Sequence, residues 1–249
     1  MLLTVIIVTK NPGIDIYPTL ASLKCLDGPE TEILIKDNSS DRSIEKLNEM
    51  FAFQNLRYIH SADEGIYDAM NQALNKAKGE FIYFLNAGDQ HVDCSLMNHL
   101  TENPSEIDYL YGDVIKLEPA STIQRYSRNM NKYLVYLKRI CHQAIVIKKS
   151  VLEEIGGFDT SLTVTADHLL IVQTVEKFKG FKISGVLSIY QGGGFSHQQP
   201  ITDTERLHFQ REVAKHFSAM EIAILNPLRF IVDKLAAIKR NRLKRKTGL

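Results

Sequence analysis

The chain has 249 residues, of which 44% are hydrophobic, and its formal net charge is +1. This length allows one sizeable core, alone or with an appendage, and the nearly balanced charge gives no reason to expect a nucleic-acid partner. No stretch reaches the ~18 apolar residues that a transmembrane helix needs. The charge is uneven, however. Eight Lys or Arg residues and one Asp follow Asn226, a local net charge of +7 against −6 for the preceding part.

The first 89 residues alternate between predicted strands and predicted helices. Strands are predicted at 2–8, 32–36, 56–59 and 81–85, and helices at 17–25, 44–51 and 65–77. This alternation is typical of an α/β fold with a mostly parallel central sheet and right-handed crossovers. Two of the strands end in polar segments that contain an acid, Asp37 and Asp89. If these strands lie side by side, both carboxylates face one crevice at the carboxyl edge of the sheet.

The stretch that ends at Asp89 is the most informative in the chain. Residues 81–85 are almost all apolar, as expected for a strand covered by helices on both faces. The strand stops at Asn86-Ala87-Gly88-Asp89, where small residues allow a ligand close to the backbone and a carboxylate could hold a hard cation. The alternative is that Asp89 caps the next helix.

Beyond Asp89 the pattern is looser. Strands are predicted at 108–115, 144–147 and 183–190, and helices at 151–155, 166–177, 201–217 and 220–245. The polar, tyrosine-containing segment 118–139 is expected to be a loop. We expect a body at 1–220, with halves at 1–115 and 116–220, followed by a basic amphipathic helix at 221–249.

The cysteines and the start of the chain bear on its location. Cys25, Cys94 and Cys141 are far apart in the sequence and fit neither a disulfide framework nor a CxxC metal site. We therefore expect a reducing, cytoplasmic compartment. The apolar residues 1–9 lack the basic segment of a signal peptide and are followed by a turn signal at 10–13, so we interpret them as a core strand.

Short motifs run in order across roughly residues 1–200. They are Val5-Ile6-Ile7-Val8-Thr9-Lys10-Asn11, Lys36-Asp37-Asn38-Ser39-Ser40-Asp41, Glu64-Gly65-Ile66-Tyr67-Asp68-Ala69-Met70-Asn71, Phe84-Leu85-Asn86-Ala87-Gly88-Asp89, Tyr111-Gly112-Asp113, His142-Gln143, Gly156-Gly157-Phe158-Asp159 and Ala166-Asp167-His168. The set resembles the inverting family 2 glycosyltransferases, which have the GT-A nucleotide-sugar fold. The likeness is greatest to a branch that acts in O-antigen, capsule and exopolysaccharide assembly.

The resemblance implies a donor site. Asp37 would accept a hydrogen bond from a uracil N–H, and Asp89 would bind the diphosphate through a divalent metal, Mg²⁺ or Mn²⁺. Ala87 or Gly88 replaces the first acid of the family's DXD motif, so we expect weak metal affinity without nucleotide. The other implied nucleotide-binding residues are Thr9, Asn11, Asn38, Asp68, Asn71, Asn86, Ala87 and Gly88. For Asp68 the alternative is a solvated acid in the first turn of a helix.

The resemblance also implies catalytic and sugar-binding residues. Asp167 matches the family's catalytic base, which would remove the proton of the acceptor hydroxyl; the alternative is a helix N-cap. His142 and Gln143 would lie near the acceptor or donor sugar, although a lone His is more often structural. Asp113 is either an acceptor-side residue or part of a turn. His197, after three glycines, would close over the diphosphate as a metal-side ligand.

We expect a metal-dependent inverting glycosyltransferase that moves a sugar from a UDP-linked donor to a lipid-linked saccharide. The alternative is a nucleotide-sugar-binding module without turnover. Other doubly wound nucleotide enzymes are not favoured, since the sequence has neither GxGxxG nor GxxxxGK[ST]. The C-terminal helix is expected either to lie on anionic lipid at the inner face of the cytoplasmic membrane or to pack on the body with a solvated basic end.

Overall fold

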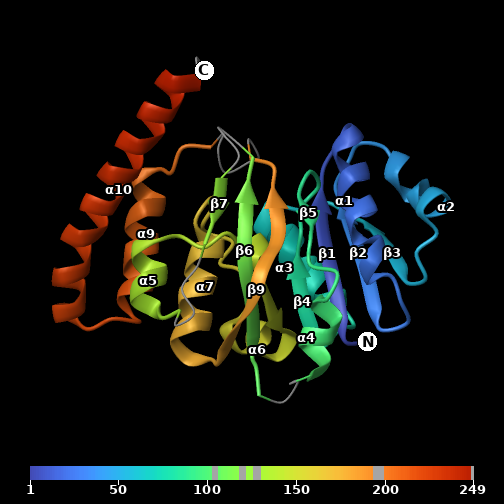
Figure 1. The fold of residues 1–249 in the computed structure, drawn as a ribbon, viewed down its shortest axis with the longest axis horizontal. Coiled ribbons are helices and arrows are strands. Elements are labelled where there is room, and N and C mark those ends of the chain that lie inside the picture. Colours follow the sequence, from blue (N-terminus) through green and yellow to red (C-terminus); the bar gives the residue numbers. More distant parts are fainter. Residues whose placement is uncertain (103–105, 118–121, 126–129, 193–198, 248–249) are drawn as a thin grey trace.

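The computed structural model describes residues 1–102, 106–117, 122–125, 130–192 and 199–247, and it shows an α/β fold (Figure 1). The first four strands are parallel: β1 (Leu3–Thr9), β2 (Thr31–Asp37), β3 (Leu56–His60) and β4 (Phe81–Phe84). The helices between them are α1 (Ile16–Ser22), α2 (Leu47–Phe51) and α3 (Ile66–Lys76), with short 3-10 turns at η1 (Gly13–Asp15), η2 (Leu23–Leu26) and η3 (Ser43–Lys46). The predicted alternation of strands and helices is confirmed.

The second half extends the same sheet with mixed strand directions. Its elements are β5 (Gln90–His91), α4 (Leu96–Glu102), β6 (Tyr109–Lys116), β7 (Thr122–Gln124), α5 (Lys132–Leu137), η4 (His142–Ala144), β8 (Ile145–Lys148), α6 (Lys149–Ile155), α7 (Ala166–Lys177), β9 (Gly180–Tyr190), α9 (Asp203–Ala214) and α10 (Ala219–Thr247). The strand order is β3-β2-β1-β4-β8-β6-β9-β5, with β7 beside β6. Strand β8 runs antiparallel to both of its neighbours, β4 and β6.

The core lies on both faces of the sheet, as the apolar strands predict. On β1, Ile6 and Val8 face a cluster that contains α3 and α7, whereas Val5 and Ile7 face a cluster that contains α1 and α4. Alternate side chains of a strand point to opposite faces, so an unbroken apolar run can fill two cores at once. This arrangement fixes β1 and β4 in the centre of the molecule.

Several details of the fold differ from the sequence-based expectations. Strand β1 lies between β2 and β4, so the strands that carry Asp37 and Asp89 are not side by side. The segment expected to be a loop contains β7 and α5. Asp89 precedes the short strand β5, so the alternative in which it caps a helix is not borne out. The short elements β5 and α4 were also not predicted, because neither is long enough to show a clear periodicity of apolar residues.

A further difference concerns the cysteines. Cys25 and Cys94 form a disulfide, with their Cα atoms 5.4 Å apart. The fold brings η2 next to the segment before α4, although 69 residues separate the two cysteines in the sequence. The expectation that the cysteines form no disulfide is therefore wrong for Cys25 and Cys94, whereas Cys141 takes no part in a disulfide.

The C-terminal helix α10 lies against α5 and α9 at the edge of the molecule (Figure 1). Within the part of the chain that the structure describes, no helix is both long enough and apolar enough to cross a membrane.

Gly79, two residues before β4, lies in close contact with the backbone of β1. Its N–H donates to Thr4 Oγ1 at 2.8 Å, and a Cβ at this position would lie 2.3 Å from the Thr4 backbone nitrogen. Gly79→Ala should therefore lower the free energy of unfolding by about 1–3 kcal/mol, measured by urea denaturation. Gly28→Ala is the control, because a Cβ there meets no atom within 4 Å. A stability within about 0.5 kcal/mol of wild type for Gly79→Ala would contradict this packing.

Candidate active site

A cavity of about 990 Å³ opens at the carboxyl ends of the parallel strands. Its size suits a ligand as large as a nucleotide-sugar. Residues after β1, β4 and β9 line it, together with residues before α3, before β8 and at the start of α7. Because β8 is antiparallel to β4, the residues that precede β8 reach the same edge as the residues that follow β4. Of the predicted site residues, the cavity is lined by Thr9, Asn11, Asn86, Ala87, Gly88, Asp89, His142, Gln143 and Asp167.

Asp89 ends a tight turn after β4. Its N–H donates to the Asn86 carbonyl at 3.0 Å, and Gly88 has a φ of 98°, which a residue with a side chain rarely adopts. The Asp89 carboxylate accepts hydrogen bonds from Gln143 Nε2 at 2.6 Å and from the Gln191 N–H at 3.1 Å. Burial raises the pKa of Asp89 to about 6, against the lowering effect of these hydrogen bonds.

The same turn supplies a second oxygen. Asn86 Oδ1 is buried and has no hydrogen-bond partner among the described residues, which is costly for a polar atom unless a ligand satisfies it. The described residues contain no group of three or more His, Cys, Asp or Glu side chains that could hold a metal by themselves. Asp89 and Asn86 are oxygen ligands of the kind that Mg²⁺ and Mn²⁺ use, and such ions take further ligands from phosphates and water. The site therefore fits a divalent cation that arrives with a diphosphate.

Asp167 lies in the first turn of α7, where the helix dipole favours an acid. Its Oδ1 accepts from Arg139 Nη2 at 2.7 Å, from the His168 N–H at 2.8 Å and from the Tyr67 hydroxyl at 3.3 Å. Its Oδ2 has one long contact, 3.4 Å from His142 Nδ1. Burial opposes ionisation, but the Arg139 charge and His142 hold the pKa of Asp167 well below its usual range. Asp167 is thus ionised, with Oδ2 the less saturated oxygen.

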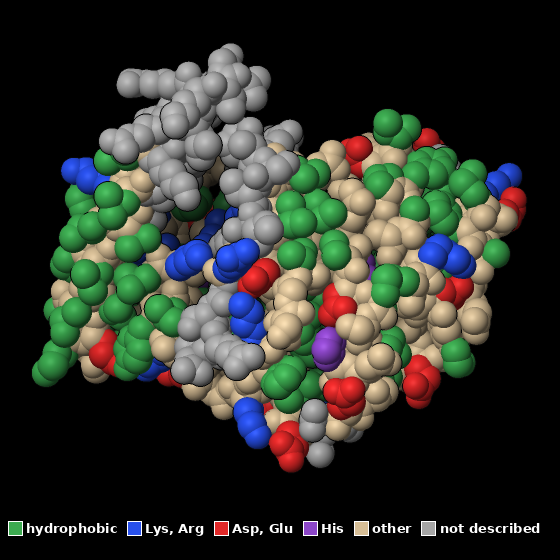
Figure 2. All heavy atoms as spheres, viewed as in Figure 1, with side chains coloured by type: hydrophobic (Ala, Val, Ile, Leu, Met, Phe, Trp, Pro, Cys, Tyr) green, Lys and Arg blue, Asp and Glu red, His purple; other side chains and the backbone are tan. Residues whose placement is uncertain are grey.

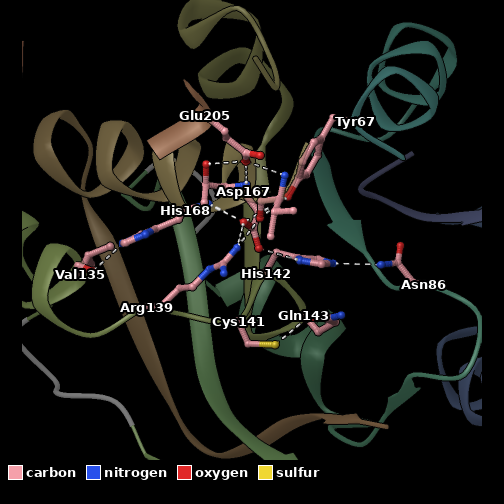
Figure 3. Close-up of polar contacts among 12 residues, drawn as sticks. Tyr67, Asn86, Val135, Arg139, Cys141, His142, Gln143, Asp167, His168 and Glu205 are labelled. Atoms are coloured by element: carbon pink, nitrogen blue, oxygen red, sulfur yellow. Dashed lines mark hydrogen bonds and ion pairs between the residues drawn. The ribbon is translucent and has the colours of Figure 1, made fainter. Parts of the chain in front are cut away.

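The start of α7 is held by Glu205 from α9 rather than by a cap from Asp167. Glu205 accepts hydrogen bonds from the Val164 N–H at 2.8 Å, the Thr165 N–H at 3.0 Å and the Thr163 hydroxyl at 2.6 Å (Figure 3). These contacts satisfy backbone donors that would otherwise be unpaired near the helix start. The N-cap alternative for Asp167 is therefore not needed, and the carboxylate remains at the cavity.

The segment 141–143 connects the two carboxylates. Gln143 donates to Asp89, and Cys141 Sγ donates to Gln143 Oε1 at 2.6 Å. Burial raises the pKa of the Cys141 thiol to about 12, so it stays protonated and fixes the direction of the Gln143 amide. On the opposite side, His142 lies between Asp167 and Asn86, whose Nδ2 is 3.3 Å from His142 Nε2 (Figure 3). The Asn86 amide nitrogen donates, so His142 Nε2 accepts. His142 therefore carries its hydrogen on Nδ1, which donates to Asp167.

Two residues expected at the base pocket do not line the cavity. Asp37 is completely buried, and its carboxylate accepts from the Ser39 N–H and hydroxyl and from the Tyr58 hydroxyl. The predicted contact with uracil is not supported by this position. Asp37 instead holds Ser39, whose Oγ accepts from the Asn11 N–H at 2.7 Å. Asn38 donates its N–H to the Thr9 carbonyl at 3.1 Å.

Three further candidates also lie outside the cavity lining. Asp68 lies in the first turn of α3 and accepts from the Glu64 N–H and from Gln72 Nε2. Both amide atoms of Asn71 bond the Phe158 backbone, which joins α3 to the turn after α6. Asp113 on β6 forms an ion pair with Lys182 at 2.8 Å. His197 lies outside the described residues.

The sequence analysis missed several cavity residues, above all Arg139 and Cys141. Arg139 lies in the segment expected to be a loop, and no local pattern marks it. Cys141 directly precedes the His142-Gln143 motif, which could have drawn attention to it. Tyr67 is buried and stacks on Phe158, and its hydroxyl also reaches Asp167. The described lining also contains five further charged residues that were not predicted as site residues: Lys10, Asp15, Asp63, Glu64 and Lys116.

The family model for glycosyl transferase family 2 matches residues 4–156. The chain belongs to glycosyl transferase family 2. It is 30% identical over 144 residues to a PGL/p-HBAD biosynthesis glycosyltransferase of Mycobacterium tuberculosis, and 27% identical over 146 residues to an uncharacterized glycosyltransferase of the same species. The first match covers 54% of each chain and the second 55%. The chain thus spans about half the length of the curated relatives it matches.

Solved structures share the fold. TarS 1–349 of S. aureus in complex with UDP-GlcNAc has a TM-score of 0.75 at 18% identity, over 92% of this chain and 71% of that one. The mannosyltransferase PcManGT of Pyrobaculum calidifontis, with GDP-Man and Mn²⁺, has a TM-score of 0.58 at 15% identity, over 95% and 75% of the two chains. The GT-A fold expected from the motifs is therefore confirmed.

The contact between Gln143 and Asp89 can be tested by metal titration. Gln143→Leu keeps the side-chain volume but removes the donor to Asp89, so the Mn²⁺ affinity of the nucleotide-bound protein should fall about 10- to 100-fold. Calorimetric titration of Mn²⁺ into the protein with excess UDP measures this affinity. Cys141→Ser retains a donor to Gln143 and should bind Mn²⁺ nearly as wild type does. Equal affinity in Gln143→Leu and wild type would show that Gln143 does not position Asp89.

Proposed function

We propose that the chain is a metal-dependent inverting glycosyltransferase that moves a sugar from a UDP-linked donor to a lipid-linked saccharide in bacterial surface polysaccharide synthesis. The observation that carries this proposal is the convergence of Asp89 and Asp167 on one cavity, each in contact with a neighbouring residue of the segment 141–143. One carboxylate suits the diphosphate side of a donor, and the other suits proton removal from an acceptor.

The donor side rests on the turn after β4. Asn86 and Asp89 would hold the divalent cation, which would offset the charge that develops on the leaving diphosphate. Thr9, the last residue of β1, and Asn11 line the cavity, and we assign them to the nucleoside. A UDP donor is supported by the TarS structure with UDP-GlcNAc, whereas the more distant PcManGT was solved with GDP-Man.

The acceptor side rests on Asp167. In an inverting displacement, the acceptor oxygen attacks the anomeric carbon while the bond to the diphosphate breaks on the opposite face. The proton of the acceptor hydroxyl passes to Asp167 Oδ2, the oxygen with one long contact. Arg139 keeps Asp167 ionised at neutral pH but also makes it a weak base. Proton transfer therefore comes late in the displacement, when the attacking oxygen has become acidic.

The acceptor class is inferred from the relatives and from the sequence motifs. The mycobacterial relative that is 30% identical to this chain is named for PGL/p-HBAD biosynthesis. We infer that the acceptor of this chain carries a lipid and that the protein works as a peripheral protein at the inner face of the cytoplasmic membrane.

A nucleotide-sugar-binding module without turnover is the second candidate. The single acid of the Asn86–Asp89 turn favours it, because such a site binds metal weakly. The ionised Asp167 at the cavity favours the enzyme hypothesis over the binding-module hypothesis. Three donors hold its Oδ1, and binding of a nucleotide-sugar alone does not require a buried base in this position. A measurement of sugar transfer distinguishes the enzyme from the binding module.

The catalytic role of Asp167 can be tested by substitution. Asp167→Asn should lower UDP release from UDP-sugars with lipid-linked acceptors by about 10²- to 10⁴-fold, because the amide cannot accept the proton. UDP binding with Mn²⁺ should stay close to wild type. Asp68→Asn, which changes an acid outside the cavity, is the control and should keep full turnover. Comparable turnover in Asp167→Asn and wild type would contradict the mechanism.

A further inference from the structure

Helix α10 is attached to the body by one face of its first turns. Leu225 is buried in the main core cluster, and Ile222 packs against that cluster. Asn226 Oδ1 accepts from the Tyr136 hydroxyl at 2.6 Å. The guanidinium of Arg229 lies 4.7 Å from the Tyr136 ring centre and 5.4 Å from that of Phe209. These contacts fix which side of the helix faces outward.

The outward side carries a row of large apolar side chains, which we call the α10 stripe. Its members recur every three or four residues, so they lie on one helix face: Met220 (75% exposed), Ile224 (57%), Leu228 (44%), Ile231 (52%), Leu235 (61%) and Ile238 (49%). Phe230 is also 60% exposed. Figure 2 shows hydrophobic side chains gathered along this edge of the molecule. Such a contiguous apolar surface on a protein exterior marks an interaction site.

The sequence that follows the stripe is strongly basic. Residues 239–246 contain six Lys or Arg and no acid. A parallel pair of α10 helices would bring two such runs together, at a cost in repulsion, and an antiparallel pair would leave the basic runs outside the paired stripe. An anionic lipid surface complements both features at once, because acyl chains cover the stripe and lipid phosphates attract the cations.

We propose that the α10 stripe and residues 239–246 form a surface that binds anionic lipid membranes. The inference rests on the proposed function, to which it adds the means of reaching a lipid-linked acceptor. Helix α10 runs so that its C-terminal end lies on the same side of the molecule as the carboxyl ends of β1 and β6 (Figure 1). The cavity opens at that edge of the sheet. A bilayer that covers the C-terminal part of the α10 stripe therefore lies beside the edge at which the cavity opens, where a lipid-linked saccharide would enter.

Co-sedimentation with lipid vesicles tests the surface. The full chain should bind vesicles of phosphatidylcholine and phosphatidylglycerol in a two-to-one mixture, and should bind pure phosphatidylcholine at least about tenfold more weakly. Added salt should weaken binding to the anionic vesicles, because it screens the basic run. The triple variant Ile231→Ser, Leu235→Ser, Ile238→Ser should bind the anionic vesicles at least about tenfold more weakly than wild type.

Met50→Ser is the matched control, since Met50 is 67% exposed on α2, far from α10; it should bind vesicles as wild type does. Failure of wild type to prefer anionic vesicles, or unchanged binding by the triple variant, would overturn the proposal. A wild-type dimer in sedimentation equilibrium that the triple variant dissociates, without vesicle binding by either, would assign the stripe to self-association and overturn it as well.

Nucleotide binding without vesicles separates this surface from the proposed function. The triple variant should bind UDP with Mn²⁺ as tightly as wild type in a calorimeter. Vesicle binding without UDP binding would refute the proposed function and leave the surface standing. UDP binding without vesicle binding would refute the surface and leave the proposed sugar-transfer reaction standing.

Discussion

The position of the segment 141–143 is the constraint on which the cavity depends. The Gln143 carbonyl accepts from the Ser188 hydroxyl at 2.7 Å and from the Tyr83 hydroxyl at 3.3 Å, so the segment is attached to both β9 and β4. From this fixed backbone, Gln143 reaches Asp89 and His142 reaches Asp167. The separation of the two carboxylates is therefore set by the geometry of three consecutive residues and does not depend on flexible loops.

The sheet topology explains why these residues meet. Parallel strands bring their carboxyl ends to one edge, and β8, inserted antiparallel between β4 and β6, brings its preceding residues to that same edge. The turn after β4, which we propose for the donor, and the segment before β8 are thus neighbours, although 54 residues separate Asp89 from Gln143 in the sequence. Glu205 then fixes the start of α7, which carries Asp167, from the other side. Both carboxylates are buried and held by hydrogen bonds, which is the preorganisation that electrostatic catalysis requires.

Local patterns predicted most of the fold, because the periodicity of apolar residues in a helix or strand depends on residues that are close together in the sequence. The apolar run of β1 and the alternation of strands and helices predicted the parallel half, and Asp89 follows its strand as expected. Contacts between distant segments could not be predicted. The Cys25–Cys94 disulfide and the burial of Asp37 behind Ser39 and Tyr58 depend on how elements pack. Arg139, which sets the ionisation of Asp167, lies in a segment whose composition indicated only a loop.

The most direct test of the account is calorimetric titration of UDP into the protein with and without Mn²⁺, in wild type and in Asp89→Ala. The account predicts that Mn²⁺ strengthens UDP binding in wild type and has no effect in Asp89→Ala, because Asp89 is the carboxylate that would hold the cation. It also predicts weak Mn²⁺ binding without UDP, since the described residues offer one carboxylate and one amide oxygen at that turn. Equal enhancement by Mn²⁺ in both proteins, or no UDP binding by wild type, would contradict the assignment of this cavity.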